Sequence, residues 1–269
     1  MSKSLGNGVS PIDVSNKFGA DILRLWALSS DYSMDVNLSD DILKGISDVY
    51  RKIRNTARYI LGNTSDFDPD NKVEYKDMEE IDKWALSRLN KLVKDCTENY
   101  ENFNFHLVYH DINQFCVTDM SNFYLDIIKD RLYTSKKDAV ERRSAQTAMY
   151  IILDALVKMV APMICFTAEE IWKYMPHTKN EQVESVMLSD WPEVVAEYDN
   201  KELEEKWNHI LELKELVAKE LEVARAQKVI GHSLNAKVTL FANEDEYKFL
   251  EENKELLTTI FIVSALDIK

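Results

Sequence analysis

Glycine and proline are scarce in this sequence, whose 269 residues include six Gly and five Pro. The two together usually make up roughly 12% of a globular chain. Sheet-rich sandwiches and barrels need many tight turns, at which these two residues are favoured. Their scarcity therefore argues against an all-β fold and favours long helices.

Cysteine is equally sparse, with Cys96, Cys116 and Cys165 widely separated and no C-x-x-C among them. This spacing excludes a disulfide framework and a thiolate zinc site, and it fits a reducing compartment. His106 and His110 have the i, i+4 spacing of a zinc-protease helix, but Leu107 stands where that pattern needs a Glu. We therefore expect no bound metal.

Long hydrophobic runs are also absent. Residues 148–166 form the most apolar window, and Asp154, Lys158 and Pro162 interrupt it. A transmembrane helix needs about 20 nearly uninterrupted apolar residues, and residues 1–10 have no apolar stretch typical of a signal peptide. The sequence therefore predicts a soluble, cytoplasmic protein with no membrane partner.

Positive charge is in deficit, because 33 Lys and Arg face 47 Asp and Glu and the net charge is −14. Such a balance excludes a general polyanion binder but leaves room for local basic faces. One lies in residues 51–58, where Arg51, Arg54, Asn55 and Arg58 form a stripe at helical spacing. A second spans residues 129–143. Each is either a solvated helix face with salt bridges or a surface that contacts phosphates.

Helical periodicity dominates residues 11–175. Ser10 and Pro11 open a first helix that Gly19 ends, and Ser39 caps a longer one with apolar residues from Ile42 to Ile60. The remaining helices are predicted at 21–28, 81–96, 107–131, 138–160 and 167–175, the last of them capped by Thr167.

A change of composition near Tyr198 predicts a different C-terminal part. Residues 198–228 read as one long amphipathic helix, 236–242 as a strand and 244–257 as a helix. Residues 259–268 are rich in β-branched residues, which favour strands. We therefore expect a mainly α protein with a small C-terminal α/β appendix.

The opening residues MSKSLGN place Lys3 between Ser2 and Ser4, ahead of glycines that permit close backbone approach. This composition suits a loop that neutralises phosphate charge, although a polar N-terminal tail can contain the same residues.

The opening MSKSLGN is followed along the chain by SPIDVSNKFGADILRLW, RNTARYILGN and YLDIIKDRLY. MSKSLGN resembles the signature loop of class I aminoacyl-tRNA synthetases, and the later segments are similar to the sequences that follow this loop in that family. The loop and the GAD-x-LR segment are shared with valyl and leucyl enzymes, whereas RNTARYILGN and YLDIIKDRLY are similar to isoleucyl-tRNA synthetases.

The resemblance implies a helical-bundle anticodon-binding domain at residues 33–195, preceded by the loop and connecting helices at 1–32 and followed by the appendix at 196–269. In such enzymes ATP, with Mg²⁺, activates isoleucine as an adenylate before transfer to isoleucine tRNA. Lys3 matches the catalytic, ATP-binding lysine of the loop, and Ser2 and Ser4 would hold ATP with it. From charge and spacing, our candidates for contact with tRNA are Arg54, Asn55, Arg58, Lys129 and Arg131.

The resemblance also implies a nucleotide-binding fold upstream of residue 1. We therefore expect this chain to be a monomeric C-terminal segment that binds isoleucine tRNA without ligase activity and holds no cofactor itself. Two alternatives stay open at this point: a segment of a valyl-tRNA synthetase, and a non-enzymatic helical interaction module.

Overall fold

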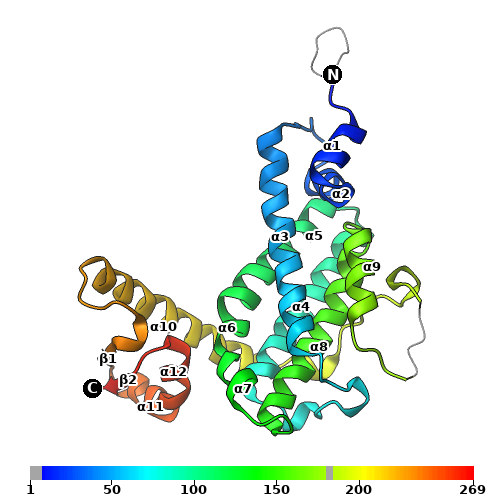
Figure 1. Cartoon of the computed structure of the whole chain (residues 1–269). Coiled ribbons are helices and arrows are strands. Elements are labelled where there is room, and N and C mark those ends of the chain that lie inside the picture. Colours follow the sequence, from blue (N-terminus) through cyan, green and yellow to red (C-terminus); the bar gives the residue numbers. More distant parts are fainter. Residues whose placement is uncertain (1–7, 180–183) are drawn as a thin grey trace. The chain divides into compact units, whose positions relative to one another are not determined.

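A computed structural model describes residues 8–179 and 184–269 of the chain. The chain forms two compact units that divide between Asp199 and Asn200 (Figure 1). In its described residues the first unit consists of helices and their connections, and the second combines helices with a small sheet. The prediction of a mainly α fold with a small α/β appendix is thus confirmed. No helix in the described part of the chain is long and apolar enough to cross a membrane.

The first unit opens with two short helices, α1 (Pro11–Phe18) and α2 (Ala20–Ser29). As predicted, Ser10 caps α1, its hydroxyl accepting a hydrogen bond from the Asp13 amide at 3.4 Å. Gly19 separates the two helices with φ 101° and ψ 152°, a conformation essentially restricted to glycine. The turn between α1 and α2 therefore depends on a residue without a Cβ atom.

Helix α3 (Asp40–Asn63) is amphipathic along its whole length. Ser39 caps it as predicted, accepting a hydrogen bond from the Ile42 amide at 3.2 Å. In the first turn the predicted stripe is wrong, because Leu43 is buried whereas Ile42 is 37% exposed. The other buried apolar residues of this helix are Ile46, Ile53, Ala57 and Ile60.

Helices α4 (Glu80–Glu101) and α8 (Val140–Val160) pack against each other and contribute more buried residues than the other helices described, and α9 (Cys165–Tyr174) packs on α8 and α3 (Figure 1). Trp84 of α4 is 1% exposed and meets Phe123 edge-on, with ring centroids 4.9 Å apart. Such a pair adds roughly 0.5–1.5 kcal/mol beyond the burial of its area.

The single helix predicted at 107–131 is wrong, because residues 105–134 form several segments. They form α5 (Phe105–Gln114), the π-helical segment η4 (Phe115–Tyr124), α6 (Leu125–Ile127) and α7 (Lys129–Thr134). In η4 the buried residues come in adjacent pairs that recur every four positions: 115 and 116, 119 and 120, 123 and 124. This four-residue recurrence lies between the 3.6 residues per turn of an α-helix and the wider turn of a π-helix.

A buried carboxylate fastens four of these segments together. Asp82 of α4 is 0% exposed and accepts hydrogen bonds from the Tyr124 hydroxyl at 2.7 Å and the Ser144 hydroxyl at 2.5 Å. The Arg131 guanidinium of α7 donates two more, at 2.7 and 3.1 Å. The network thus ties α4, η4, α7 and α8, and it satisfies a charge that would otherwise be costly to bury.

Single 3₁₀ turns lie in the connections. They are η2 (Pro69–Asn71), η3 (Tyr75–Asp77), η5 (Val186–Leu188), η6 (Ala196–Tyr198) and, in the second unit, η7 (Ser233–Asn235).

The second unit contains α10 (Lys201–Ala226), β1 (Lys237–Leu240), α11 (Glu244–Glu252), α12 (Lys254–Phe261) and β2 (Ala265–Ile268). The two strands pair in parallel, with Lys237 opposite Ala265 and Leu240 opposite Ile268.

One detail of the prediction for this second unit is wrong, because the helix predicted at 244–257 is split at Asn253. The second of the two helices continues through residues 259–261 of the β-branched segment. Leu257, Ile260 and Phe261 are buried at a helical spacing, so packing decides the conformation of these residues over the preference of β-branched residues for strands.

Candidate nucleic-acid interface

A groove of about 290 Å³ lies between α3 and α9 in the first unit. Helix α3 contributes one wall and α9 the other, and both carry polar or aromatic side chains into it. Its lining residues are Tyr50, Arg54, Arg58, Leu61, Thr167, Glu170, Ile171 and Tyr174.

Arg54 and Arg58 supply the positive charge of this groove. They lie one helical turn apart on α3, and both are exposed. Neither forms an ion pair with any residue that the structure describes, whereas Arg51 on the same helix pairs with Asp48. Unpaired guanidinium groups can bind phosphate oxygens bidentately. Asn55, the third predicted contact on α3, is also exposed but does not line the groove.

An aromatic ring that the sequence analysis missed stands on the opposite wall. Tyr174 is 66% exposed, and the Lys173 ammonium lies 5.9 Å from its ring centroid. A nucleic-acid base stacked on such a ring gains roughly 1–3 kcal/mol. The sequence offers little to mark Tyr174, because an aromatic residue at the end of an amphipathic helix is more often buried.

A second hollow extends the groove. It shares Tyr50, Thr167 and Glu170 with the groove and continues to Phe166, which is 66% exposed. The α3–α9 surface thus combines unpaired arginines with two exposed aromatic rings. Proteins that bind single-stranded nucleic acid use this combination of a positive groove and stacking platforms.

The second predicted basic cluster, residues 129–143, is largely engaged inside the protein. Arg131 is bound to the buried Asp82, so its guanidinium is not available to a phosphate. Arg142 pairs with Asp66 at 2.9 Å, and Arg143 lies 3.8 Å from the same carboxylate. Lys129 is 49% exposed and pairs with Asp126. For the arginines of this cluster the salt-bridge interpretation therefore holds.

The electrostatics of Asp66 agree with that role. Burial opposes the charged form of its carboxyl group, but the hydrogen bonds from Arg142 and Gln146 and the charge of the two arginines lower its pKa below the usual value. Arg142 and Arg143 therefore stabilise the connection that follows α3.

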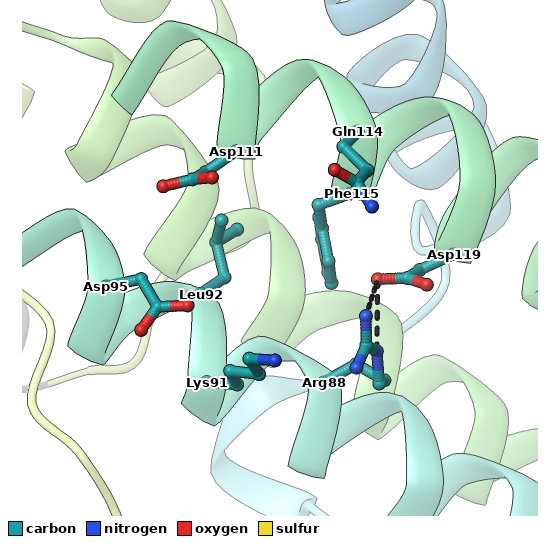
Figure 2. Close-up of a pocket in the computed structure, with 8 residues that line it drawn as sticks. All are labelled: Arg88, Lys91, Leu92, Asp95, Asp111, Gln114, Phe115 and Asp119. Carbon is teal, nitrogen blue, oxygen red and sulfur yellow. Dashed lines mark hydrogen bonds and ion pairs between the residues drawn. The ribbon is translucent and has the colours of Figure 1, made fainter. Parts of the chain in front are cut away.

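Another pocket, of about 110 Å³, lies between α4 and the α5–η4 segment (Figure 2). Figure 2 shows Asp95 and Asp111 at one end and Arg88 turned to Asp119 at the other, where the Arg88 Nε atom donates to Asp119 at 3.1 Å. Burial and the neighbouring Asp95 raise the pKa of Asp111. Three carboxylates outnumber Lys91 and the already paired Arg88, so this pocket is unsuited to phosphate.

The predicted catalytic and ATP-binding residues Ser2, Lys3 and Ser4 lie outside the described residues. Within the described part of the chain, no group of three or more His, Cys, Asp and Glu side chains converges as a metal site would require.

Two family models match the chain. Residues 1–39 match the model "tRNA synthetases class I (I, L, M and V)", and residues 82–240 match "Anticodon-binding domain of tRNA ligase". The chain belongs to the anticodon-binding domain family of tRNA ligases.

Curated relatives make the likeness more specific. The chain is 54% identical over 271 aligned residues to the isoleucine–tRNA ligase of Caldicellulosiruptor saccharolyticus, covering 100% of this chain and 29% of that protein. It is 52% identical to the isoleucine–tRNA ligase of Caldanaerobacter subterraneus subsp. tengcongensis, covering 99% of this chain and 28% of that protein. The chain thus spans less than a third of the length of these relatives. The resemblance to isoleucyl-tRNA synthetases is confirmed.

A solved structure shows the same fold. The agnB2 LeuRS of Agrobacterium radiobacter K84, in its ternary complex with tRNA and LeuAMS, superposes with a TM-score of 0.55. The match has 20% sequence identity and covers 72% of this chain and 22% of that one.

Proposed function

We propose that this chain is the C-terminal, tRNA-binding segment of an isoleucine–tRNA ligase, acting as part of a monomeric cytoplasmic enzyme. The single observation that carries the proposal is the α3–α9 groove, in which Arg54 and Arg58 face the exposed ring of Tyr174. The family of the chain and its isoleucine–tRNA ligase relatives support this assignment.

The groove suits a single-stranded RNA loop. Sequence-specific RNA recognition targets unstacked bases, which stack on aromatic rings and Arg planes while nearby cations bind the backbone. In our proposal Arg54 and Arg58 bind the phosphates of the anticodon loop, and Tyr174 stacks on one of its bases. Asn55 and Lys129 are exposed enough to add contacts outside the groove.

The chemistry of the intact enzyme is assigned to the other end of the chain. There Lys3 would stabilise the negative charge that develops on the phosphates of ATP during adenylate formation, with Ser2 and Ser4 beside it. ATP and Mg²⁺ would be bound by the nucleotide-binding fold of the intact enzyme. We expect this chain by itself to bind isoleucine tRNA and to show no ligase activity.

Fluorescence anisotropy with the anticodon stem-loop of isoleucine tRNA tests the assignment. Arg54→Ala and Arg58→Ala should each weaken binding about fivefold to tenfold, because a lost charge-assisted contact costs roughly 1 kcal/mol or more. Each should also make the slope of log affinity against log salt shallower by about 0.7. Both side chains are exposed, so the free energy of unfolding should change by no more than about 0.5 kcal/mol.

Lys44→Ala is the matched control, because Lys44 is exposed on the same helix and pairs with Asp41 outside the groove. The affinity and the salt slope of the Lys44→Ala protein should equal those of the unmodified protein. Equal affinities for the unmodified protein and for both arginine variants would contradict the proposal. Tighter binding of the valine than of the isoleucine anticodon stem-loop would instead assign the chain to the valyl enzymes.

A further inference from the structure

Helix α2 holds the corner at which α8 ends and α9 begins. The Arg24 guanidinium donates hydrogen bonds to the backbone carbonyl of Pro162 at 2.7 Å and to that of Met163 at 3.3 Å. These carbonyls follow the end of α8 and have no partner within a regular helix. Arg24 thus attaches α2 to a turn that lies far away in the sequence.

Asp21, one turn before Arg24, caps α9 from outside that helix. Its carboxylate accepts hydrogen bonds from the Phe166 amide at 3.3 Å, the Thr167 amide at 2.8 Å and the Thr167 hydroxyl at 2.6 Å. Ile164 occupies the N-cap position of α9 and has no side-chain oxygen. A carboxylate at this end also opposes the positive end of the helix dipole.

The same hydroxyl connects α9 to α3. Thr167 uses its proton toward Asp21, so its oxygen accepts a hydrogen bond from the Tyr50 hydroxyl of α3 at 2.8 Å. Tyr50 and Thr167 both line the groove, on the walls that carry Arg58 and Tyr174. One chain of hydrogen bonds thus runs from the buried Asp21 to the two walls of the groove.

We propose that Asp21 is a positioning residue for RNA binding: it sets α9 against α3, so that Tyr174 and the two arginines face the same strand of RNA. The inference rests on the proposed function of the groove. It assigns a role to the GAD-x-LR segment at residues 19–24, which comes after the MSKSLGN loop in the chain and which the proposed function leaves unused. Asp21 is 7% exposed, so it acts through Thr167 rather than by contact with RNA.

The sign of the charge change makes Asp21→Asn a sharp test. Removing a negative charge should slightly strengthen the binding of a polyanion. If Asp21 positions α9, the substitution should instead weaken binding of the isoleucine anticodon stem-loop about fivefold, within the range usual for residues that act at a distance. Amide hydrogen exchange at Phe166 and Thr167 should become faster in the free protein, because an asparagine side chain accepts at one oxygen only.

Asp35→Asn is the control with the same charge change, because Asp35 is exposed in the connection after α2; its affinity should be unchanged or slightly higher. Thr167→Val removes the hydroxyl and should weaken binding, whereas Thr167→Ser keeps it and should bind within about twofold of the unmodified protein. If the Asp21→Asn protein does not fold, the comparison of Thr167→Val with Thr167→Ser tests the positioning role in its place.

Two outcomes would overturn the inference at different levels. Full affinity of Asp21→Asn and Thr167→Val, alongside weakened Arg58→Ala, would refute the positioning role and leave the proposed function intact. No binding by the unmodified protein would refute both together.

Discussion

At the scale of single residues, the partner of a side chain decides its role more than its type does. Arg54 and Arg131 are both arginines in basic stretches of sequence, yet Arg54 faces solvent and Arg131 is bound to a buried carboxylate. Although burial opposes the charged form, Asp82 raises the pKa of Arg131. The guanidinium is therefore part of the core network rather than a free cation.

We expect Arg131→Ala to lower the free energy of unfolding by about 3–5 kcal/mol, because it leaves the Asp82 charge buried and without its cation. Urea denaturation monitored by circular dichroism measures the change. Lys129→Ala, also on α7, removes only the partly exposed ion pair with Asp126 of α6 and should change stability by less than about 1 kcal/mol. If the Arg131→Ala protein is stable but binds RNA more weakly, the result would instead support the predicted contact between Arg131 and tRNA.

Local sequence indicates that Arg54 and Arg58 lack ion-pair partners, but it cannot predict the ion pair of Arg131 or the exposure of Tyr174. Arg54 and Arg58 have no acidic residue between 51 and 58, so local sequence already indicates that they lack partners. Arg131 has its partner 49 positions away at Asp82, and no local pattern reports a contact of that range. Tyr174 escapes prediction because its exposure depends on how α9 packs.

At the scale of elements, two caps made by neighbouring residues were predicted correctly, whereas the cap predicted at Thr167 is wrong because a distant residue supplies it. Ser10 and Ser39 cap α1 and α3 as the sequence indicates. Helix α9 begins at Cys165 rather than at Thr167. Its cap comes from Asp21, 146 positions away from Thr167, so the residues next to the start of the helix do not mark where it begins. The π-helical turns of η4 are likewise set by packing against α3 and α4.

Two glycine substitutions should have opposite effects on stability. Gly19→Ala forces a Cβ atom onto a backbone with φ 101° and should cost about 1–3 kcal/mol. Gly45→Ala places the Cβ atom in open space on α3 and should stabilise by about 0.5–1 kcal/mol, because alanine loses less conformational entropy in a helix. Thermal denaturation compares the two variants directly. A neutral Gly19→Ala would show that the α1–α2 turn tolerates another backbone conformation.

At the scale of the whole molecule, the groove belongs to the first unit alone, and both units are acidic. Residues 200–269 carry ten Lys and Arg against 14 Asp and Glu, and all residues that line the groove belong to the first unit. A net charge of −14 makes long-range attraction of RNA weak. Binding should therefore rest on short-range contacts within the groove.

A chain that ends at Asp199 should consequently bind the isoleucine anticodon stem-loop within about threefold of the full 269 residues, since it loses more negative than positive charge and none of the groove. Anisotropy titrations of both proteins in the same salt test this. Circular dichroism confirms that the shorter chain keeps its helices. A loss of affinity above about tenfold would place RNA contacts in the second unit as well.

The parallel pairing of β1 with β2 has a consequence for the order in which the protein folds during synthesis. Lys237 cannot find its partner until Ala265 has been made, because parallel strands need a crossover between them, here α11 and α12. The first unit has no such dependence and can fold while later residues are still being translated. A ribosome that stalls between the two strands would therefore display a folded first unit, while the residues that follow Asp199 still lack their sheet.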